Sequence, residues 1–265
     1  MNSPEFTYSP KWLGSFLDGI YDGSITEYEL SEPLYYDIVA YLKSGLYKGF
    51  GGKLTDFVGQ DLELLEELRN NVYMFSAAKT YQQTKEIQSM MINEAGELRS
   101  SKEFTELGKA TFEQWNVDWG RTERNTAEGM AQQASKWNEI EKNKDLLPIL
   151  EYSTSGGDAC DICVPLDGMT AEVDDPIWDS VAPLNHFNCE CVLLQHEEGK
   201  ALTPDAEKEA TIDTVHGNMS DTFMMNAGKD RVIFSENHPY FDVPKKDIPF
   251  AKENFGLPIP SEDEE

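Results

Sequence analysis

The sequence predicts an α+β fold: a mainly helical N-terminal region with long packed helices, a small antiparallel β unit, and an irregular C-terminal extension. Before residue 146, apolar residues repeat at helical spacing, which is typical of amphipathic helices. Between residues 147 and 199, short apolar runs are bounded by turn residues, as expected for short strands. The same interval holds all four cysteines, and regular spacing is lost beyond it.

The composition limits the classes of protein that the chain can represent. Its 265 residues allow one large or two modest domains, and 39% hydrophobic residues suffice for a core. No apolar run is long enough to cross a bilayer, so we expect no membrane association. With 49 acidic and 22 basic residues, the net charge is −27. Such a surface repels phosphate backbones, so we expect no strong sequence-independent nucleic-acid binding.

The predicted helices follow in chain order. The first thirty residues combine aromatic residues with glycine and proline, and we expect an arm or short helices there. A helix is predicted from Pro33 to Gly49, because proline suits a first turn and further glycines follow its end. A longer helix is predicted to end at residues 93–96. Its apolar residues step by three and four positions at Leu65, Leu68, Val72 and Phe75.

A third helical region is predicted from Ser101 to Lys144. Within it, Trp115 and Trp119 share a face at a spacing of four residues. The stripe continues at Met130, Ala134, Trp137 and Ile140. We expect these aromatic and methionine stripes to pack in the core and not to bind a cofactor.

Two strands are predicted around the cysteines. Residues 149–152 form the first strand, and residues 191–195 return beside it. Between them, residues 174–178 (DDPIW) predict a turn followed by a buried aromatic side chain. The cysteines therefore lie in loops at the tip of a small antiparallel unit.

The part of the chain after residue 199 is less regular. A helix is predicted there, with Thr203 as its cap and Pro204 in its first turn. Residues 223–241 are expected to be irregular, with short strands. The end of the chain, residues 258–265, is expected to be a solvated and disordered acidic tail.

The cysteines are spaced as metal ligands. Cys160 and Cys163 form a C-x2-C pair, and His186, Cys189 and Cys191 follow as H-x2-C-x-C. Thiolates paired on two loops, with an imidazole beside the second pair, suit a tetrahedral metal centre, and zinc accepts such a mixed set. We predict structural Zn²⁺ held by four of these five candidate ligands. The ion would then replace missing hydrophobic area, giving a zinc-stabilised β unit.

Disulfides, redox sensing and free thiols are the alternatives for the cysteines. Residues 1–7 have neither a basic start nor an apolar core, so we expect no signal peptide and a protein that is not secreted. Thiols then stay reduced, which favours metal binding. Cys189 and Cys191 are also too close in sequence to pair without strain.

No catalytic residues are predicted. The metalloprotease motif H-E-x-x-H, the phosphate-binding G-x-x-x-x-G-K-[ST] loop and the G-x-S-x-G motif are absent from the sequence. A Cys189 nucleophile paired with His186 is conceivable, but the ligand spacing favours a metal-binding role. The aspartates between residues 158 and 179 could hold Mg²⁺, although turn capping is the simpler role. His238, with Lys229 and Arg231 upstream, is either a ribonuclease-like centre or a structural histidine.

Several short motifs together resemble a known family. They are Leu166-Asp167-Gly168, residues 174–179 (DDPIWD), Cys189-Glu190-Cys191, and the upstream segments 71–79 (NVYMFSAAK) and 122–127 (TERNTA). In this combination, over about residues 60–196, the chain resembles the phage Mu protein F-like minor head proteins of the phage head morphogenesis family. Family members commonly carry His at the position of Cys163, often no ligand at the position of Cys160, and Arg at that of Glu190. Exchange of His for Cys keeps metal-ligand chemistry, which supports a metal there.

The resemblance implies a minor head protein of a tailed phage or prophage, acting in head morphogenesis or DNA delivery by binding the portal and other head proteins. It would lie in the virion, and in the host cytoplasm during assembly. Some relatives carry toxin or nuclease domains after this module, so a ribonuclease-like or other toxin-type activity in the C-terminal segment is one alternative. A zinc-ribbon-like adaptor of a host cell is the other. The predicted domains are a helical assembly domain with an N-terminal arm (1–146), a Mu F-like metal-binding β module (147–199) and an irregular extension with an acidic tail (200–265).

Overall fold

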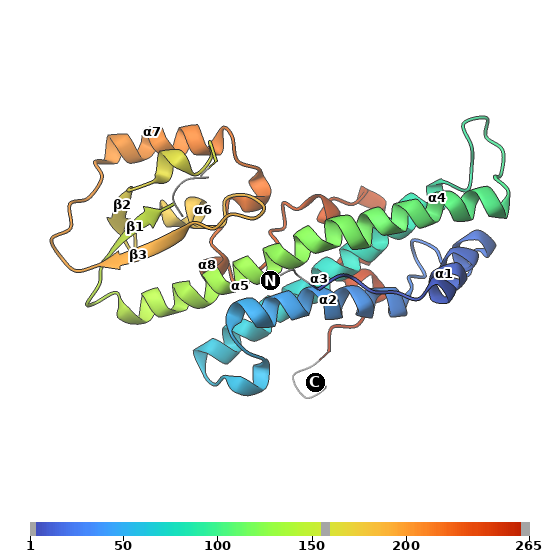
Figure 1. Cartoon of the computed structure of the whole chain (residues 1–265), viewed down its shortest axis with the longest axis horizontal. Coiled ribbons are helices and arrows are strands. Elements are labelled where there is room, and N and C mark those ends of the chain that lie inside the picture. The colour runs from blue at the N-terminus through green and yellow to red at the C-terminus, as the bar shows by residue number, and fades with distance from the viewer. Residues whose placement is uncertain (1–3, 155–159, 261–265) are drawn as a thin grey trace. The chain divides into compact units, whose positions relative to one another are not determined.

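The computed structural model describes residues 4–154 and 160–260. The chain is α+β, with long helices followed by a three-stranded antiparallel sheet (Figure 1). Within the described residues, no helix combines the length and the apolar character needed to cross a membrane. The chain divides into two compact units. Unit 1 comprises Met1–Lys43, Asn70–Arg124 and Pro239–Glu265, and unit 2 comprises Ser44–Arg69 and Asn125–His238.

The long helices appear in the predicted order. They are α1 (Pro10–Asp22), α2 (Glu32–Phe50), α3 (Gln60–Ser89), α4 (Ser101–Glu113) and α5 (Gly120–Asn143). The helix predicted from Pro33 and the longer helix after it are both present, but α3 ends at Ser89 and not at the predicted residues 93–96. The third predicted region consists of α4 and α5 joined by a π-helix, Gln114–Trp119, a wider turn that is rare and often found at functional sites.

Side-chain caps fix where two of these helices begin. Helix α1 starts at Pro10 because the Ser9 hydroxyl accepts the Trp12 N–H at 3.0 Å. Helix α4 starts with a reciprocal cap, in which Ser100 Oγ accepts the Glu103 N–H and Glu103 Oε2 accepts the Ser100 N–H.

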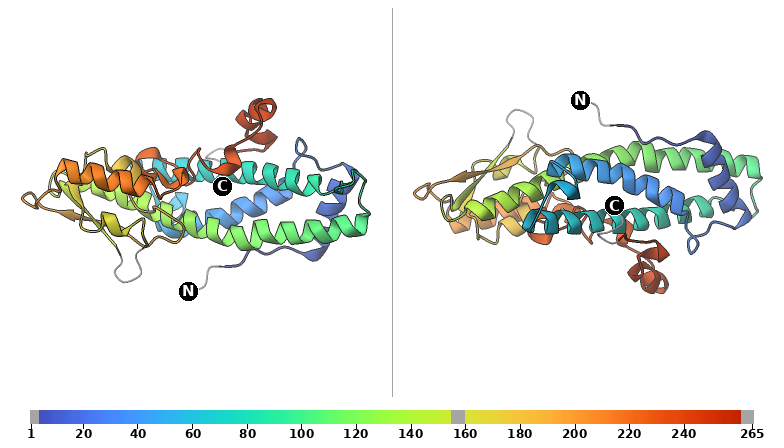
Figure 2. Two further views of the ribbon diagram at one scale, coloured as in Figure 1. Left: turned by 90° about the horizontal axis from the view of Figure 1, so that it is seen from above. Right: turned by 90° about the horizontal axis from the view of Figure 1, so that it is seen from below.

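In unit 1, an aromatic cluster joins the C-terminal segment to α2 and α3. Phe255 stacks on Tyr81 with ring centres 4.8 Å apart, and Tyr240 packs on Phe75 at 5.2 Å. Asp247 accepts a hydrogen bond of 2.8 Å from the Tyr81 hydroxyl. Figure 2 shows this segment, in red, beside α3. Residues from both ends of the chain therefore share one core.

A buried ion pair lies in the same unit. Lys79 pairs with Glu123, and their side chains are only 1% and 6% exposed. The Lys79 ammonium also donates to the Trp115 carbonyl in the π-helix at 2.6 Å, and the Tyr240 hydroxyl donates to Glu123 Oε1 at 2.8 Å. Burial lowers the pKa of Lys79, although Glu123 opposes that shift. The two upstream segments of the family resemblance thus meet in a buried, hydrogen-bonded ion pair.

Unit 2 is built around the sheet, whose strand order is β2-β1-β3. The predicted strands are confirmed as β1 (Ile149–Ser153) and β3 (Val192–His196), which pair antiparallel with Leu150 opposite Gln195. The third strand, β2 (Thr170–Glu172), was not predicted. Helices α2 and α5 approach closely here, because a Cβ at Gly49 would lie 1.8 Å from the Glu128 carbonyl oxygen.

The remaining elements of unit 2 are short, apart from one helix. They are α6 (Trp178–Val181), α7 (Asp205–His216), α8 (Ala227–Asp230) and the 3-10 turns Leu54–Asp56, Val164–Leu166 and Asp221–Phe223. In unit 1, the C-terminal segment forms α9 (Ile248–Lys252) and the 3-10 turns Pro239–Phe241, Lys245–Asp247 and Asn254–Gly256.

Two expectations for the C-terminal part are wrong. Thr203 does not cap α7: Pro204 occupies the N-cap position, and the Thr203 hydroxyl accepts the Thr170 N–H at 3.0 Å. Among the described residues, 223–241 form helical turns and no strand. At the start of the predicted tail, the Pro258 carbonyl accepts the Tyr35 hydroxyl at 2.6 Å, and residues 261–265 lie outside the described residues.

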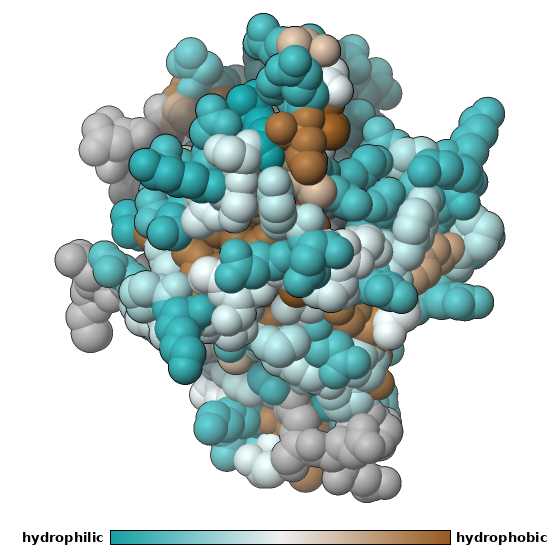
Figure 3. All heavy atoms as spheres, turned by 90° about the vertical axis from the view of Figure 1, so that its right-hand side faces the viewer, coloured by the Kyte–Doolittle hydropathy of each residue, from teal (hydrophilic) through white to brown (hydrophobic). Residues whose placement is uncertain are grey.

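One face of the molecule shows how polar and apolar residues are distributed on its surface. Viewed from the right-hand side of Figure 1, it is mostly hydrophilic, with hydrophobic residues in small separate patches (Figure 3).

Candidate metal centre

The first cysteine pair is positioned by the turn between β1 and β2. Asp167 accepts hydrogen bonds of 2.8 Å from both the N–H and the hydroxyl of Thr154, and these bonds lower the pKa of the Asp167 carboxyl. Gly168 has a φ of 78°, which favours glycine, and its N–H donates to the Tyr152 carbonyl at 2.9 Å. The Leu-Asp-Gly motif is therefore a turn that fixes the approach to Cys163.

Cys160 and Cys163 lie on one tight turn. The Cys160 carbonyl accepts the N–H groups of Cys163 and Val164, both at 3.0 Å. Cys163 is fully buried, whereas Cys160 is partly exposed. The turn brings both sulfurs to the same side of the loop, where they lie within 4.8 Å of each other and of a ring nitrogen of His186.

The second cysteine pair follows an irregular segment before β3. Asn188 adopts a φ of 59°, a left-handed conformation that asparagine tolerates. The backbone N–H groups of Asn185 and Cys191 both donate to the sulfur of Cys189. Such N–H···S bonds stabilise a thiolate and fix its direction.

The loops bring all five predicted ligands together in two overlapping groups. Cys163 belongs to both groups, because its sulfur lies within 4.8 Å of the ligand atoms of Cys160 and His186, and also of Cys189 and Cys191. Cys163, Cys189 and Cys191 are all buried. The sulfurs of Cys163 and Cys189 are 3.8 Å apart, and all four cysteines are free thiols. The disulfide alternative is therefore not what the structure contains.

The three buried thiols are electrostatically unequal. Hydrogen bonds from the Cys163 and Cys191 thiols lower the pKa of Cys189. The same bond to Cys189 raises the pKa of Cys163, with burial adding to the effect. The shared hydrogen bonds therefore couple the ionisation of the three thiols.

A buried hydrogen-bond relay supports Cys163. The Tyr152 hydroxyl donates to the Cys163 sulfur at 3.4 Å and accepts from Asn185 Nδ2 at 3.1 Å. The Asn185 amide also donates to the Val181 carbonyl at 3.3 Å. Tyr152 and Asn185 are both fully buried, and burial raises the pKa of the Tyr152 phenol. Sequence reasoning missed both residues; the only available signal was a polar-tipped aromatic in a strand just before the cysteines.

His186 has a defined tautomer. Its Nδ1 lies 2.9 Å from the Phe187 carbonyl oxygen. A carbonyl oxygen only accepts, so this contact places a proton on Nδ1, and the tautomer with that proton alone has a free lone pair on Nε2. That arrangement is usual for histidines that bind metal through Nε2.

The aspartates of the second family motif have structural partners. Asp175 Oδ1 accepts the Ile177 N–H at 3.0 Å and so forms the turn before Trp178. Trp178 is fully buried and donates its indole N–H to the Glu172 carbonyl at 2.9 Å. Asp179 pairs with Lys229 at 2.6 Å. These contacts support turn capping over a Mg²⁺ site, while Asp158 lies outside the described residues.

The cations considered for a ribonuclease-like centre are engaged elsewhere. Lys229 pairs with Asp179, and Arg231 pairs with Glu67. The His238 ring packs edge-on against Phe234 with ring centres 6.2 Å apart.

The donor set fits a zinc ion. Tetrahedral zinc with Zn–S bonds of about 2.3 Å places its sulfurs about 3.8 Å apart, the separation found between Cys163 and Cys189. Each group of ligand atoms is compact enough to hold a metal ion. The fold and the site together define a helical protein with a cysteine-rich candidate metal module on a small sheet.

Residues 67–194 match the family described as phage Mu protein F like protein. The resemblance seen in the sequence motifs is thereby confirmed: this segment, just under half of the chain, supports the phage head morphogenesis family of minor head proteins. The matched segment includes Lys79, Glu123 and all four cysteines. No curated protein and no solved structure matches the chain.

Proposed function

We propose that the chain is a minor head protein of a tailed phage or prophage in which a structural Zn²⁺ holds the loops of unit 2 in shape. The spacing of 3.8 Å between the sulfurs of Cys163 and Cys189 carries the zinc part of this proposal. Cys163, Cys189 and Cys191 supply three thiolates, and His186 Nε2 supplies the fourth ligand. Cys160, in the same group as His186, is the alternative fourth ligand.

A shell of this kind has a structural role. Four protein ligands leave no position for a water molecule, so the ion would not activate a nucleophile. Its contribution is to stabilise a sheet of three short strands, which has little apolar area of its own. Tyr152 and Asn185 would orient Cys163 as hydrogen-bonding partners behind the ligand.

The proposed role in the head is supported by the family match. A phage Mu protein F-like segment spans residues 67–194, and we propose that the chain acts in head morphogenesis or DNA delivery by binding the portal and other head proteins. The turn-capping contacts of the aspartates, together with the closed ligand shell proposed above, favour binding over turnover.

Metal analysis tests the zinc proposal. Protein purified without chelator is expected to contain one zinc per chain, and Cys163→Ser, Cys189→Ser and Cys191→Ser are each expected to lose it. His186→Ala separates the two candidates for the fourth ligand, because it should weaken zinc binding while Cys160→Ser does not. Wild-type protein without stoichiometric zinc would refute the proposal.

Particle composition tests the head role. In the phage or prophage that encodes the chain, purified heads should contain it at low copy number by quantitative mass spectrometry. Deletion of the gene should reduce the yield of infectious particles, and a wild-type copy should restore it. Normal particles that form without the protein and never contain it would refute this role.

A further inference from the structure

The two edges of the sheet in unit 2 differ. The outer edge of β2 is covered, because the Thr203 N–H donates to the Thr170 carbonyl at 3.1 Å and the Thr170 N–H donates back to the Thr203 hydroxyl at 3.0 Å. Strand β3 pairs with β1 on its inner side. Among the described residues, none forms a main-chain hydrogen bond to the other side of β3. An uncovered edge of this kind can accept a further strand.

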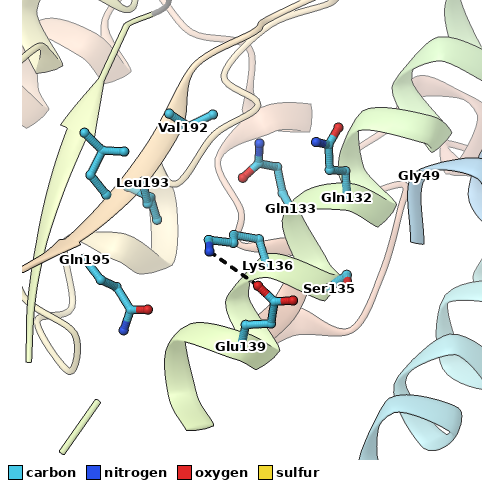
Figure 4. A pocket seen from close by; sticks show the side chains of 10 residues that line it. Gly49, Gln132, Gln133, Ser135, Lys136, Glu139, Val192, Leu193 and Gln195 are labelled. Carbon is cyan, nitrogen blue, oxygen red and sulfur yellow. Dashed lines mark hydrogen bonds and ion pairs between the residues drawn. The ribbon is translucent and has the colours of Figure 1, made fainter. Parts of the chain in front are cut away.

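A groove lies along this open edge. It has a volume of about 490 Å³ and is lined by β3 residues 192–195, by Gly49 and by one face of α5 (Figure 4). The α5 residues that line it are Gln132, Gln133, Ser135, Lys136 and Glu139.

Hydrogen bonds hold the two walls of the groove at its ends. Gln133 Nε2 donates to the Cys191 carbonyl at 3.3 Å, just before β3 begins. Gln195 Nε2 donates to the carbonyls of Ile140 and Leu147 at 3.1 and 3.2 Å. These bonds fix the position of β3 relative to α5, so the strand edge between them is held in place before a ligand binds.

The side chains along β3 define the chemistry of the occupant. Val192 and Leu194 are 42% and 44% exposed, although edge strands are usually protected by charged residues. Exposed glutamates flank the strand, with Glu190 before it and Glu197 and Glu198 after it. An added strand would therefore match apolar residues at alternate positions and basic residues at its ends.

Charge decides between two kinds of occupant. A second copy of the chain would place these glutamates against each other, and each copy carries a net charge of −27. Like charges opposite each other across paired strands are destabilising. An extended, basic segment of another protein would instead place positive charges opposite these glutamates, and such opposite-charge pairs are stabilising.

We propose that the open edge of β3 binds an extended segment of a partner protein by strand addition. The segment has alternating apolar residues and is flanked by lysine or arginine. This inference goes beyond the proposed function, because it assigns a docking surface and the sequence character of its ligand. It does not depend on the identity of the partner.

Synthetic peptides test the proposal with the full chain. The probe is a fluorescent nine-residue peptide with valine at alternate positions and two lysines at each end. Its counterparts carry glutamates in place of the lysines, or N-methyl groups on alternate backbone amides. We expect the basic peptide to bind at least tenfold more tightly than either counterpart, because one loses charge complementarity and the other loses the main-chain hydrogen bonds.

A matched pair of variants locates the binding site. Leu194→Lys places a like charge on the edge and should weaken binding of the basic peptide at least tenfold. Leu202→Lys makes the same change at a residue of similar exposure, 45%, and should leave binding unchanged. Equal binding of all three peptides, or equal effects of the two variants, would overturn the proposal. Dimerisation of the chain that Leu194→Lys abolishes would also overturn it, in favour of a second copy.

Discussion

Replacing Tyr152 with phenylalanine tests whether a buried hydroxyl supports the metal centre. The change removes one oxygen that donates to the Cys163 sulfur at 3.4 Å and accepts from Asn185 at 3.1 Å. The aromatic ring and its packing in β1 are retained. Asn185 keeps its bond to the Val181 carbonyl, so its amide is not left without an acceptor.

The expected magnitude follows from the hydrogen bond that is lost. Once zinc binds, Cys163 is a thiolate, and a hydrogen bond to a charged group contributes about 1.5–3 kcal/mol. Since about 1.4 kcal/mol corresponds to a factor of ten, zinc affinity should fall by roughly 10- to 100-fold. That range agrees with the usual effect of removing a partner behind a metal ligand.

The assay is competition with a chromophoric zinc chelator at constant pH. Tyr21→Phe serves as a control, because it removes a hydroxyl that donates to the Arg99 carbonyl at 2.8 Å in unit 1, and it should leave zinc affinity unchanged. In the Co²⁺-substituted protein, the sulfur-to-metal absorption bands should shift in Tyr152→Phe and not in the control. Unchanged affinity and unchanged bands would refute the supporting role of Tyr152. Failure of the wild-type protein to bind zinc would instead refute the zinc proposal itself.

Three further predictions concern stability. Lys79→Met leaves Glu123 buried without its cation and should lower the free energy of unfolding by about 3–5 kcal/mol. Urea denaturation measures this loss. The double variant Lys79→Met/Glu123→Leu should recover most of it. Trp178→Ala removes a fully buried indole and should cost about 3–5 kcal/mol, so a loss below about 1 kcal/mol would contradict the packing described here. Burial raises the pKa of Tyr81 and Tyr240 above the ordinary value of 10.0, so the folded state keeps protons that the unfolded state releases. The urea midpoint should therefore fall as the pH rises above about 10, and less steeply in Tyr81→Phe/Tyr240→Phe; equal slopes would contradict this explanation.

The sequence was most informative where regular spacing extended over many residues. The apolar steps at Leu65, Leu68, Val72 and Phe75 predicted α3, and all four side chains are fully buried. The paired cysteines predicted the candidate site, because short loops of fixed spacing allow few arrangements. Strands β1 and β3 were also predicted, because each is a short apolar run and the two runs lie on either side of the cysteine loops.

The remaining features depend on tertiary contacts or are too short to leave a pattern. Strand β2 has three residues, fewer than one reliable alternation. The π-helix differs from its neighbours in its hydrogen bonding, which leaves no pattern in the sequence. The spacing of Trp115 and Trp119 predicted that both pack in the core, but only Trp115 is buried and Trp119 is 41% exposed. Tyr152 contacts Cys163 only because β1 and the cysteine turn fold together. Thr203 resembled a helix cap, but its hydroxyl accepts the backbone N–H of Thr170 in β2.

The aromatic cluster of unit 1 has a consequence for biosynthesis. Phe255 and Leu257 occupy the same core as Tyr35 and Val39, so more than two hundred residues of chain separate its two halves. A ribosome delivers the N-terminal half first, and the core stays incomplete until residue 257 has left the exit tunnel. We therefore expect nascent chains that stop short of that point to expose tyrosines to chaperones and proteases, so that only fully translated copies accumulate.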